Sequence, residues 1–190
     1  MRVIGIDPGT AIVGYGILDY EGNKFTPVDY GCIYTDKDTP MPDRLVLIYD
    51  GLRALLEKYR PQELAIEELF YFRNTTTVIP VGQARGVILL AARQMGISVK
   101  GYTPPQVKMG VTGYGKAEKK QVQLMVQRLL GLKELPKPDD AADALALAVT
   151  HINALGSLAY GLTVTKALSG KAVKKDKMSA AELRKLLGIN

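Results

Sequence analysis

The sequence contains one cysteine, Cys32, and one histidine, His151. A single cysteine cannot form an intramolecular disulfide, which suits a reducing compartment, and we expect the protein to be cytoplasmic. One cysteine and one histidine are also too few for a zinc site of the Cys/His type, so any metal must be held by oxygen ligands. Oxygen ligands favour Mg²⁺, Mn²⁺ or Ca²⁺.

Long apolar runs are missing as well. No run is longer than residues 87–92, far short of the ~20 residues that span a bilayer, and Asp7 interrupts the segment where a secretory signal would need its apolar core. We therefore expect no membrane association. With 47% hydrophobic and 23% charged residues the composition excludes wholesale disorder, and 190 residues suffice for one domain, with or without an appendage.

Acidic residues are almost absent from the middle of the chain. Residues 71–133 carry 10 basic side chains and one acid, Glu118, whereas residues 1–70 have a net charge of −5 and residues 134–156 a net charge of −3. Residues 157–190 return to +5. A basic block between two acidic blocks suits a metal site that faces a polyanion such as a phosphate backbone. The alternative is a solvated surface whose charges are scattered by chance.

Apolar periodicity and turn residues predict an α/β fold. The predicted strands are residues 2–7, 13–20, 24–34, 63–67 and 98–102. The predicted helices are residues 42–59, 77–95, 104–111, 117–130 and 140–153. This order predicts a mixed five-stranded sheet flanked by helices, with three consecutive antiparallel strands followed by parallel strands. We expect a folded domain over residues 1–156 and a basic extension over 157–190 that is flexible or docks a partner.

Four carboxylates occupy positions that can converge. Asp7 and Glu67 each end an apolar strand, and parallel neighbouring strands bring such residues to one edge of the sheet, where α/β proteins keep their ligand sites. Strand alternation turns Glu68 to the opposite face, so Glu67 is preferred. Asp140 and Asp143 share one face of a helix, in a first turn that favours anions.

Such a set of carboxylates would be mutually repulsive without cations. With two divalent ions it becomes a two-metal site for phosphoryl transfer. The structural alternatives are a helix N-cap for Asp139 or Asp140 and a plain surface position for Asp143. His151 lies on the face of Asp143 but two turns away, so we expect a satisfied polar group, with a catalytic role as the alternative.

Two glycine-rich segments invite comparison with phosphate-binding loops. Gly14 and Gly16 leave room for a close approach to the backbone after the first strand. Residues 110–116 match G-x-x-x-x-G-K, but Ala117 replaces the Ser or Thr of a nucleotide-binding loop and an apolar strand does not precede it. A flexible basic loop near DNA is the better interpretation.

Short motifs follow one another in a specific order and spacing between about Arg2 and Ala154. They are GIDPGT, GYG, GCI, RL-x-LIY, AIEELF, GQARGV, PPQVK, G-x-G-x-AEK and DAADALALA-x-TH. Together they resemble the RuvC family of Holliday junction resolvases, within the RNase H-like superfamily. The residues after Gly156 fall outside this pattern, and we expect them to act as an electrostatic accessory.

The resemblance implies a structure-selective, Mg²⁺-dependent endonuclease of homologous recombination and DNA repair. It implies a homodimer whose two sites nick opposed strands of a four-way junction, leaving a 5′-phosphate and a 3′-hydroxyl. Each site would hold two Mg²⁺ ions, with Mn²⁺ possible, and the RuvA/RuvB branch-migration complex would be a partner. The implied metal ligands and catalytic residues are Asp7, Glu67, Asp140 and Asp143.

DNA contacts are expected from both the resemblance and the composition. The resemblance assigns them to Lys108 and Lys119 and assigns stacking on a base near the crossover to Phe70. Arg73 and Lys116 are added because they are basic residues next to the aromatic loop and the glycine-rich loop. Two other functions remain as alternatives: an RNase H-like nuclease acting on another nucleic acid, such as an RNA–DNA hybrid, and a non-catalytic junction-binding module.

Overall fold

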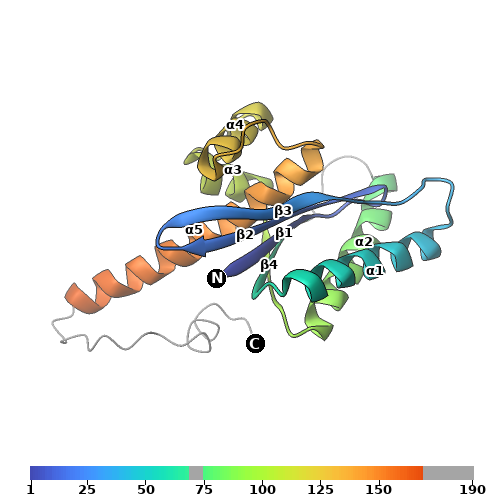
Figure 1. Ribbon diagram of the computed structural model, residues 1–190, viewed down its shortest axis with the longest axis horizontal. Coiled ribbons are helices and arrows are strands. Elements are labelled where there is room, and N and C mark those ends of the chain that lie inside the picture. The colour runs from blue at the N-terminus through green and yellow to red at the C-terminus, as the bar shows by residue number, and fades with distance from the viewer. Residues whose placement is uncertain (69–74, 169–190) are drawn as a thin grey trace. The chain divides into compact units, whose positions relative to one another are not determined.

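The computed structural model describes the backbone of residues 1–68 and 75–168 and the side chains of residues 1–68 and 78–156 (Figure 1). The strands are β1 (Arg2–Asp7), β2 (Ile12–Glu21), β3 (Lys24–Tyr34), β4 (Glu63–Glu67) and β5 (Ser98–Tyr102). The helices are α1 (Met41–Tyr59), α2 (Thr75–Gln94), α3 (Pro104–Thr112), α4 (Lys119–Leu130) and α5 (Asp139–Leu168). The chain divides into two compact units, Met1–Asn153 and Ala154–Asn190. The described part of the second unit is helical as far as Leu168.

The five strands form one mixed sheet in the order β3-β2-β1-β4-β5. Strand β2 pairs antiparallel with both β1 and β3, whereas β4 pairs parallel with both β1 and β5. The register between β2 and β3 shifts where Ile17 faces Asp29 and Leu18 faces Pro27, so that Val28 has no partner on β2. The predicted fold class, with three antiparallel strands followed by parallel ones, is confirmed.

Apolar cores lie on both faces of the sheet. On one face, Ile4 of β1 packs with Leu52 of α1 and Ile88 of α2. On the other face, Val3 packs with residues of α4 and α5 such as Leu145. All five side chains are fully buried. Figure 1 shows α1 and α2 on one side of the strands and α3 and α4 on the other. Successive residues of β1 thus face different cores, as strand alternation requires.

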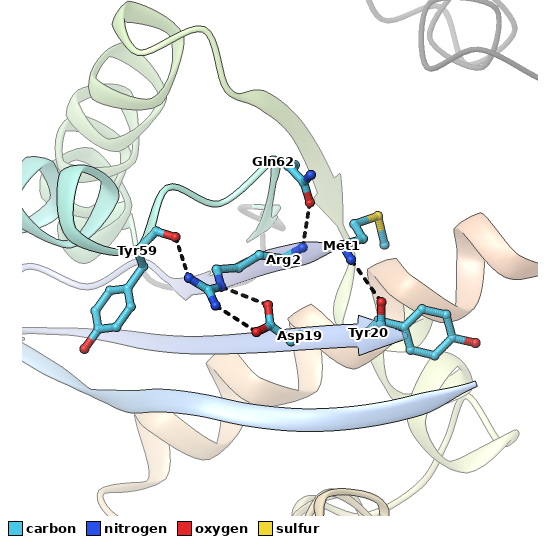
Figure 2. Close-up of polar contacts among 6 residues, drawn as sticks. All are labelled: Met1, Arg2, Asp19, Tyr20, Tyr59 and Gln62. Atoms are coloured by element: carbon cyan, nitrogen blue, oxygen red, sulfur yellow. Dashed lines mark hydrogen bonds and ion pairs between the residues drawn. The ribbon is translucent and has the colours of Figure 1, made fainter. Parts of the chain in front are cut away.

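The beginning of β1 is held by a set of polar contacts (Figure 2). The Arg2 guanidinium donates two hydrogen bonds to the Asp19 carboxylate, both 2.8 Å long, and a third to the carbonyl of Tyr59 at 2.9 Å. The Arg2 backbone amide donates to Gln62 Oε1 at 2.7 Å. These contacts tie β1 to β2 and to the connection between α1 and β4, at the end of β1 opposite to Asp7.

Three glycines let α5 lie directly on the backbone of β1 and β2. A Cβ atom added to Gly5 would lie 1.9 Å from the carbonyl oxygen of Ala144, and one added to Gly14 would lie 2.1 Å from that of Asp140. Gly16, which pairs with Gly5 across the two strands, would meet Leu145 at 2.8 Å. The close approach expected at Gly14 and Gly16 is therefore made by a helix of the same chain.

The structure corrects several predicted helix boundaries. Helix α5 was expected over 140–153 but continues to Leu168. It contains Gly156 and Gly161, and each glycine costs a helix only about 1 kcal/mol. Helix α4 begins at Lys119 rather than at 117, since Glu118 and Gln121 form a capping box. Helix α2 begins at Thr75 and contains Pro80.

The glycine-rich segment 110–116 does not form a nucleotide-binding loop. Gly110 lies inside α3, where an added Cβ would lie 2.6 Å from the Thr150 side chain, and Gly113 ends this helix in the left-handed conformation with φ 74°. The segment therefore connects two helices, whereas a nucleotide-binding loop follows a strand. None of the helices in the described part of the chain has the length and apolar character needed to cross a membrane.

Candidate active site

Asp7 and Glu67 lie side by side at the carboxyl ends of two paired strands. Strands β1 and β4 are parallel with Ile6 opposite Ile66, so the next residue of each strand emerges at the same edge of the sheet. A hydrogen bond joins the two carboxyl side chains. Asp7 and Glu67 therefore lie together, as predicted from their positions at the ends of two strands.

Asp140 and Asp143 reach this edge because α5 begins there. The carbonyl of Asp140 lies against Gly14, and Gly14 is the residue that pairs with Asp7 across β1 and β2. Asp140 and Asp143 are three positions apart near the start of α5, so both can face the sheet edge. The glycine contact therefore brings carboxylates about 130 residues apart in sequence into one cluster.

Burial and mutual repulsion raise the pKa values of carboxyl groups in this cluster. Burial, followed by the negative charges of Glu67, Asp143 and Asp140, raises the pKa of Asp7 to about 8. Burial also raises the pKa of Glu67 and of Asp143. Crowded, half-buried carboxylates of this kind are stabilised by a nearby cation, and hard divalent ions prefer carboxylate oxygen ligands. The chemistry of the donor set therefore fits Mg²⁺ or Mn²⁺.

Glu68 does not belong to this cluster. A Cβ added to Gly101 of β5 would lie 2.6 Å from Glu68 Oε1, so the Glu68 carboxylate covers that glycine. The Glu68 backbone amide donates to the carbonyl of Tyr102 at 2.9 Å. The preference for Glu67 that strand alternation gave thus agrees with the positions of the two side chains.

A small cavity lies beside the carboxylates. Its volume is about 170 Å³. The residues that line it are Glu67, Pro104, Val107, Lys108, Lys119, Val122, Asp143 and Leu147. Two carboxylates and two lysines from four different elements therefore share one concave surface, with an apolar wall supplied by α3, α4 and α5. A concave site with convergent polar groups is the usual form of a binding site.

Lys119 forms ion pairs within this site. Its Nζ lies 3.0 Å from Asp143 Oδ2 and 3.3 Å from Asp139 Oδ2. Burial lowers the pKa of Lys119, but its contacts with Asp143 and Asp139 outweigh this and raise it. Within the described ranges, no three His, Cys, Asp or Glu side chains are already arranged around a common point that would suit a metal. The Asp143 carboxylate is paired with Lys119 instead.

The other predicted contact residues have different positions. Lys116 is exposed between α3 and α4 and is not among the residues that line the cavity. Phe70 and Arg73 lie outside the described residues.

Two residues near the site were not predicted as part of it. Asp139 was considered only as a helix cap, yet its spacing of four residues from Asp143 places both on one helix face and could have indicated a shared partner. Arg85 of α2 donates from Nε to the backbone carbonyl of Glu67 at 3.1 Å. No local pattern indicated that contact, because it depends on how α2 packs beside β4.

His151 is a buried polar group away from the cluster. Its side chain is 2% exposed, its Nδ1 shares a hydrogen bond of 2.8 Å with the Tyr102 hydroxyl, and its Nε2 lies 3.8 Å from Glu63 Oε2. Burial, followed by the charge of Lys100, lowers the pKa of His151 to about 4. The neutral imidazole is thus the native form at pH 7. The expectation of a fully satisfied polar group is met only at Nδ1, because the buried Nε2 has no hydrogen-bond partner in the described part of the chain.

This lowered pKa predicts a loss of stability in acid. The unfolded chain binds a proton at His151 below pH 6.5, whereas the native state does so only below about pH 4. We expect this residue to reduce the free energy of unfolding by about 3 kcal/mol as the pH falls through that window. Urea unfolding of the wild type and His151→Gln at several pH values measures it. The difference between the two proteins isolates His151, and a difference that does not change between pH 7 and pH 4.5 contradicts the assignment.

Known proteins resemble this chain over most of its length. The model of the family "Crossover junction endodeoxyribonuclease RuvC" matches residues 3–151. A crossover junction endodeoxyribonuclease RuvC from Fusobacterium nucleatum is 64% identical over 164 residues, which are 86% of this chain and 86% of that protein. The protein of the same name from Desulfitobacterium hafniense is 56% identical over 158 residues, covering 83% of this chain and 96% of the relative.

Solved structures show the same likeness. Thermus thermophilus RuvC matches with a TM-score of 0.78 and 38% identity, covering 83% of this chain and 96% of that one. A structure described as T. thermophilus RuvC in complex with Holliday junction substrate matches with a TM-score of 0.76 and 36% identity over the same shares. The carboxylates, the glycine contacts and the cavity described above all lie within the matched residues 3–151.

Proposed function

This chain belongs to the RuvC family of crossover junction endodeoxyribonucleases, and from that premise we propose how its carboxylate cluster cuts DNA. The protein resolves Holliday junctions. The observation that carries the proposed site is the convergence of Asp7, Glu67, Asp140 and Asp143 at one sheet edge, beside a cavity that Lys108 and Lys119 also line. These carboxylates hold divalent metal, and the lysines contact the DNA.

The proposed reaction is metal-dependent hydrolysis of a phosphodiester that leaves a 5′-phosphate and a 3′-hydroxyl. Two bound Mg²⁺ ions, or Mn²⁺ in their place, would supply an activated water and neutralise the charge that develops on the leaving oxygen. Asp7 and Glu67 hold metal from the sheet side, and Asp140 and Asp143 hold it from the helix side. Because these residues sit on core strands and on a buried helix, their backbone positions are set before DNA binds.

The lysines have a separate task in this proposal. Lys108 and Lys119 place positive charge on the wall of the cavity next to the carboxylates, where a phosphate has to lie for attack. Most of the affinity for DNA comes from phosphate contacts of this kind. Lys116 and Arg73 add further backbone contacts, and Phe70 stacks on a base at the crossover. Residues 157–190 serve as a basic accessory outside the nuclease domain of residues 1–156.

Symmetric resolution requires two sites, so we also propose a homodimer. Helices α1 and α2 pack together and expose large apolar side chains that a second copy could cover. They are Val46, Leu47, Ile79 and Leu90, each between 49% and 69% exposed. Burial of such side chains against a second copy would favour association. The RuvA/RuvB branch-migration complex is the proposed functional partner at the junction.

A substrate panel tests this function. We expect the protein to nick two opposed strands of a mobile four-way junction at symmetric positions with Mg²⁺ or Mn²⁺, and to cut a Y-fork, a duplex or an RNA–DNA hybrid far more slowly. Ligation of the nicked products tests for a 5′-phosphate and a 3′-hydroxyl. Faster cleavage of the hybrid would favour a general RNase H-like activity, and junction binding without cleavage in any metal would indicate a binding module.

A further inference from the structure

The ion pairs of Lys119 join the site to a fifth carboxylate. Lys119 is the first residue of α4, and its Nζ lies between Asp143 at 3.0 Å and Asp139 at 3.3 Å. The two carboxylates are one turn apart on α5. Asp143 faces the cavity with 35% of its side chain exposed, whereas the Asp139 side chain is 62% exposed and does not line the cavity. One ammonium group therefore bridges a site carboxylate and a surface carboxylate.

The ion pair between Lys119 and Asp143 opposes metal binding at Asp143. The Asp143 oxygen that pairs with Lys119 is unavailable to a divalent ion for as long as the pair persists. Two cations that share one carboxylate also repel each other, by an amount that grows as water is excluded. Lys119 must therefore loosen its contact with Asp143 when metal binds, and it then needs another acceptor if it is to stay beside the cavity.

Asp139 is such an acceptor, and it already touches the ammonium. We propose that Asp139 is a positioning residue that draws Lys119 away from Asp143 when a divalent ion binds and keeps the ammonium at the cavity for the DNA phosphate. Asp139 acts through Lys119 and does not itself hold metal. This inference rests on the proposed function, because it presumes that Asp143 is a metal ligand.

A double-mutant cycle on metal affinity tests the role of Asp139. In Asp139→Asn, Lys119 has only Asp143 as its partner, so we expect the dissociation constant for Mn²⁺ to rise about two- to fivefold, the scale of a partly exposed ion pair. Mn²⁺ binding is measured without DNA, by titration calorimetry or from the EPR signal of free Mn²⁺. In a Lys119→Met background the same substitution should change affinity by less than about twofold, since there is no ammonium to compete.

The double-mutant cycle distinguishes an effect of Asp139 that acts through Lys119 from a direct effect of its negative charge on the metal. Loss of a negative charge near the metal weakens binding equally with and without Lys119, so equal effects in both backgrounds overturn the proposal. An unchanged dissociation constant in Asp139→Asn also overturns it. Asp139→Glu keeps a carboxylate that can follow the ammonium, and we expect it to restore most of the affinity. Glu134→Gln is the matched control, because Glu134 is exposed and has no ion pair among the described residues.

Cleavage provides a second readout. The Mg²⁺ concentration for half-maximal junction nicking should rise in Asp139→Asn in parallel with the Mn²⁺ dissociation constant. A failure of the proposed function itself is distinct from a failure of this inference. In that case the wild type shows no saturable Mn²⁺ binding that Asp7→Asn abolishes. Failure of the inference alone leaves wild-type binding normal, with Asp139→Asn either indistinguishable from the wild type or weakened equally in both backgrounds.

Discussion

Replacing Asp7 by Asn should abolish junction nicking and at the same time stabilise the metal-free protein. Burial and the charges of Glu67, Asp143 and Asp140 raise the pKa of Asp7 to about 8, so native Asp7 binds a proton that the unfolded chain releases near pH 4. This difference in proton binding lowers the free energy of unfolding above about pH 4, and the loss grows as the pH rises towards 8. Asn removes it, and we expect a gain of about 2–4 kcal/mol in the free energy of unfolding at pH 7.

Cleavage should respond in the opposite direction. We expect Asp7→Asn to lose more than about 10²-fold in nicking rate, beyond the 10–100-fold cost typical of losing only an outer partner of a metal. Junction binding should persist, because less negative charge near the phosphates does not weaken the electrostatic attraction.

The same preparations are tested by urea unfolding in chelator at pH 5 and pH 8, by gel shift and by nicking assays. The stability gain should be larger at pH 8 than at pH 5. Addition of Mg²⁺ should stabilise the wild type and leave Asp7→Asn nearly unchanged, since only a ligand that binds the native state shifts unfolding. Nicking at the wild-type rate would remove Asp7 from the site, and a lower stability at pH 7 in chelator would contradict the crowding of carboxylates.

Gly5→Ala should be among the most damaging substitutions in the chain. The added Cβ would lie 1.9 Å from the carbonyl oxygen of Ala144 and 2.8 Å from the backbone nitrogen of Ala148, so the helix α5 or the strand β1 has to move. Overpacking against side chains costs 1–3 kcal/mol, and backbone atoms yield less readily, so we expect a loss of about 3 kcal/mol or more. Because α5 carries Asp140 and Asp143, nicking should fall even in protein that remains folded.

Gly156→Ala serves as the matched control. Gly156 also lies in α5, but an added Cβ meets nothing within 4 Å, and alanine favours a helix over glycine by about 1 kcal/mol. We therefore expect no loss of stability and up to about 1 kcal/mol of gain. Urea denaturation and the rate of junction nicking are measured for both variants. Wild-type stability in Gly5→Ala would show that α5 does not pack as closely on β1 as described.

Local patterns in the sequence were sufficient to predict the strands of the sheet. Alternation and turn residues mark strands over a few residues, so the predicted bounds of β1, β3, β4 and β5 agree with the structure. The meeting of Asp7 and Glu67 followed from them, because it needs only that two strand ends be parallel neighbours. The convergence of Asp140 and Asp143 on the same edge was expected from their charge and chemistry, and the helix contact that produces it could not be read locally.

That contact lies between residues far apart in the chain. Gly14 and Gly16 indicate that something comes close to the strands, but the sequence does not state that the neighbour is α5. The pair between Lys119 and Asp139 was missed for the same reason, since it depends on how the starts of two helices approach each other. The predicted helix over residues 140–153 is shorter than α5, because the local apolar pattern that marks a helix weakens after Gly156.

The shift of register between β2 and β3 has a consequence for how copies of this protein can associate. Strand β3 lies at the outer edge of the sheet, where free backbone groups could recruit a strand from another molecule and begin aggregation. Pro27 has no amide hydrogen to offer, and the unpaired Val28 next to it bends the strand out of the regular ladder. Addition of a strand along β3 is therefore disfavoured, so the protein can be concentrated on DNA without extending its sheet at this edge.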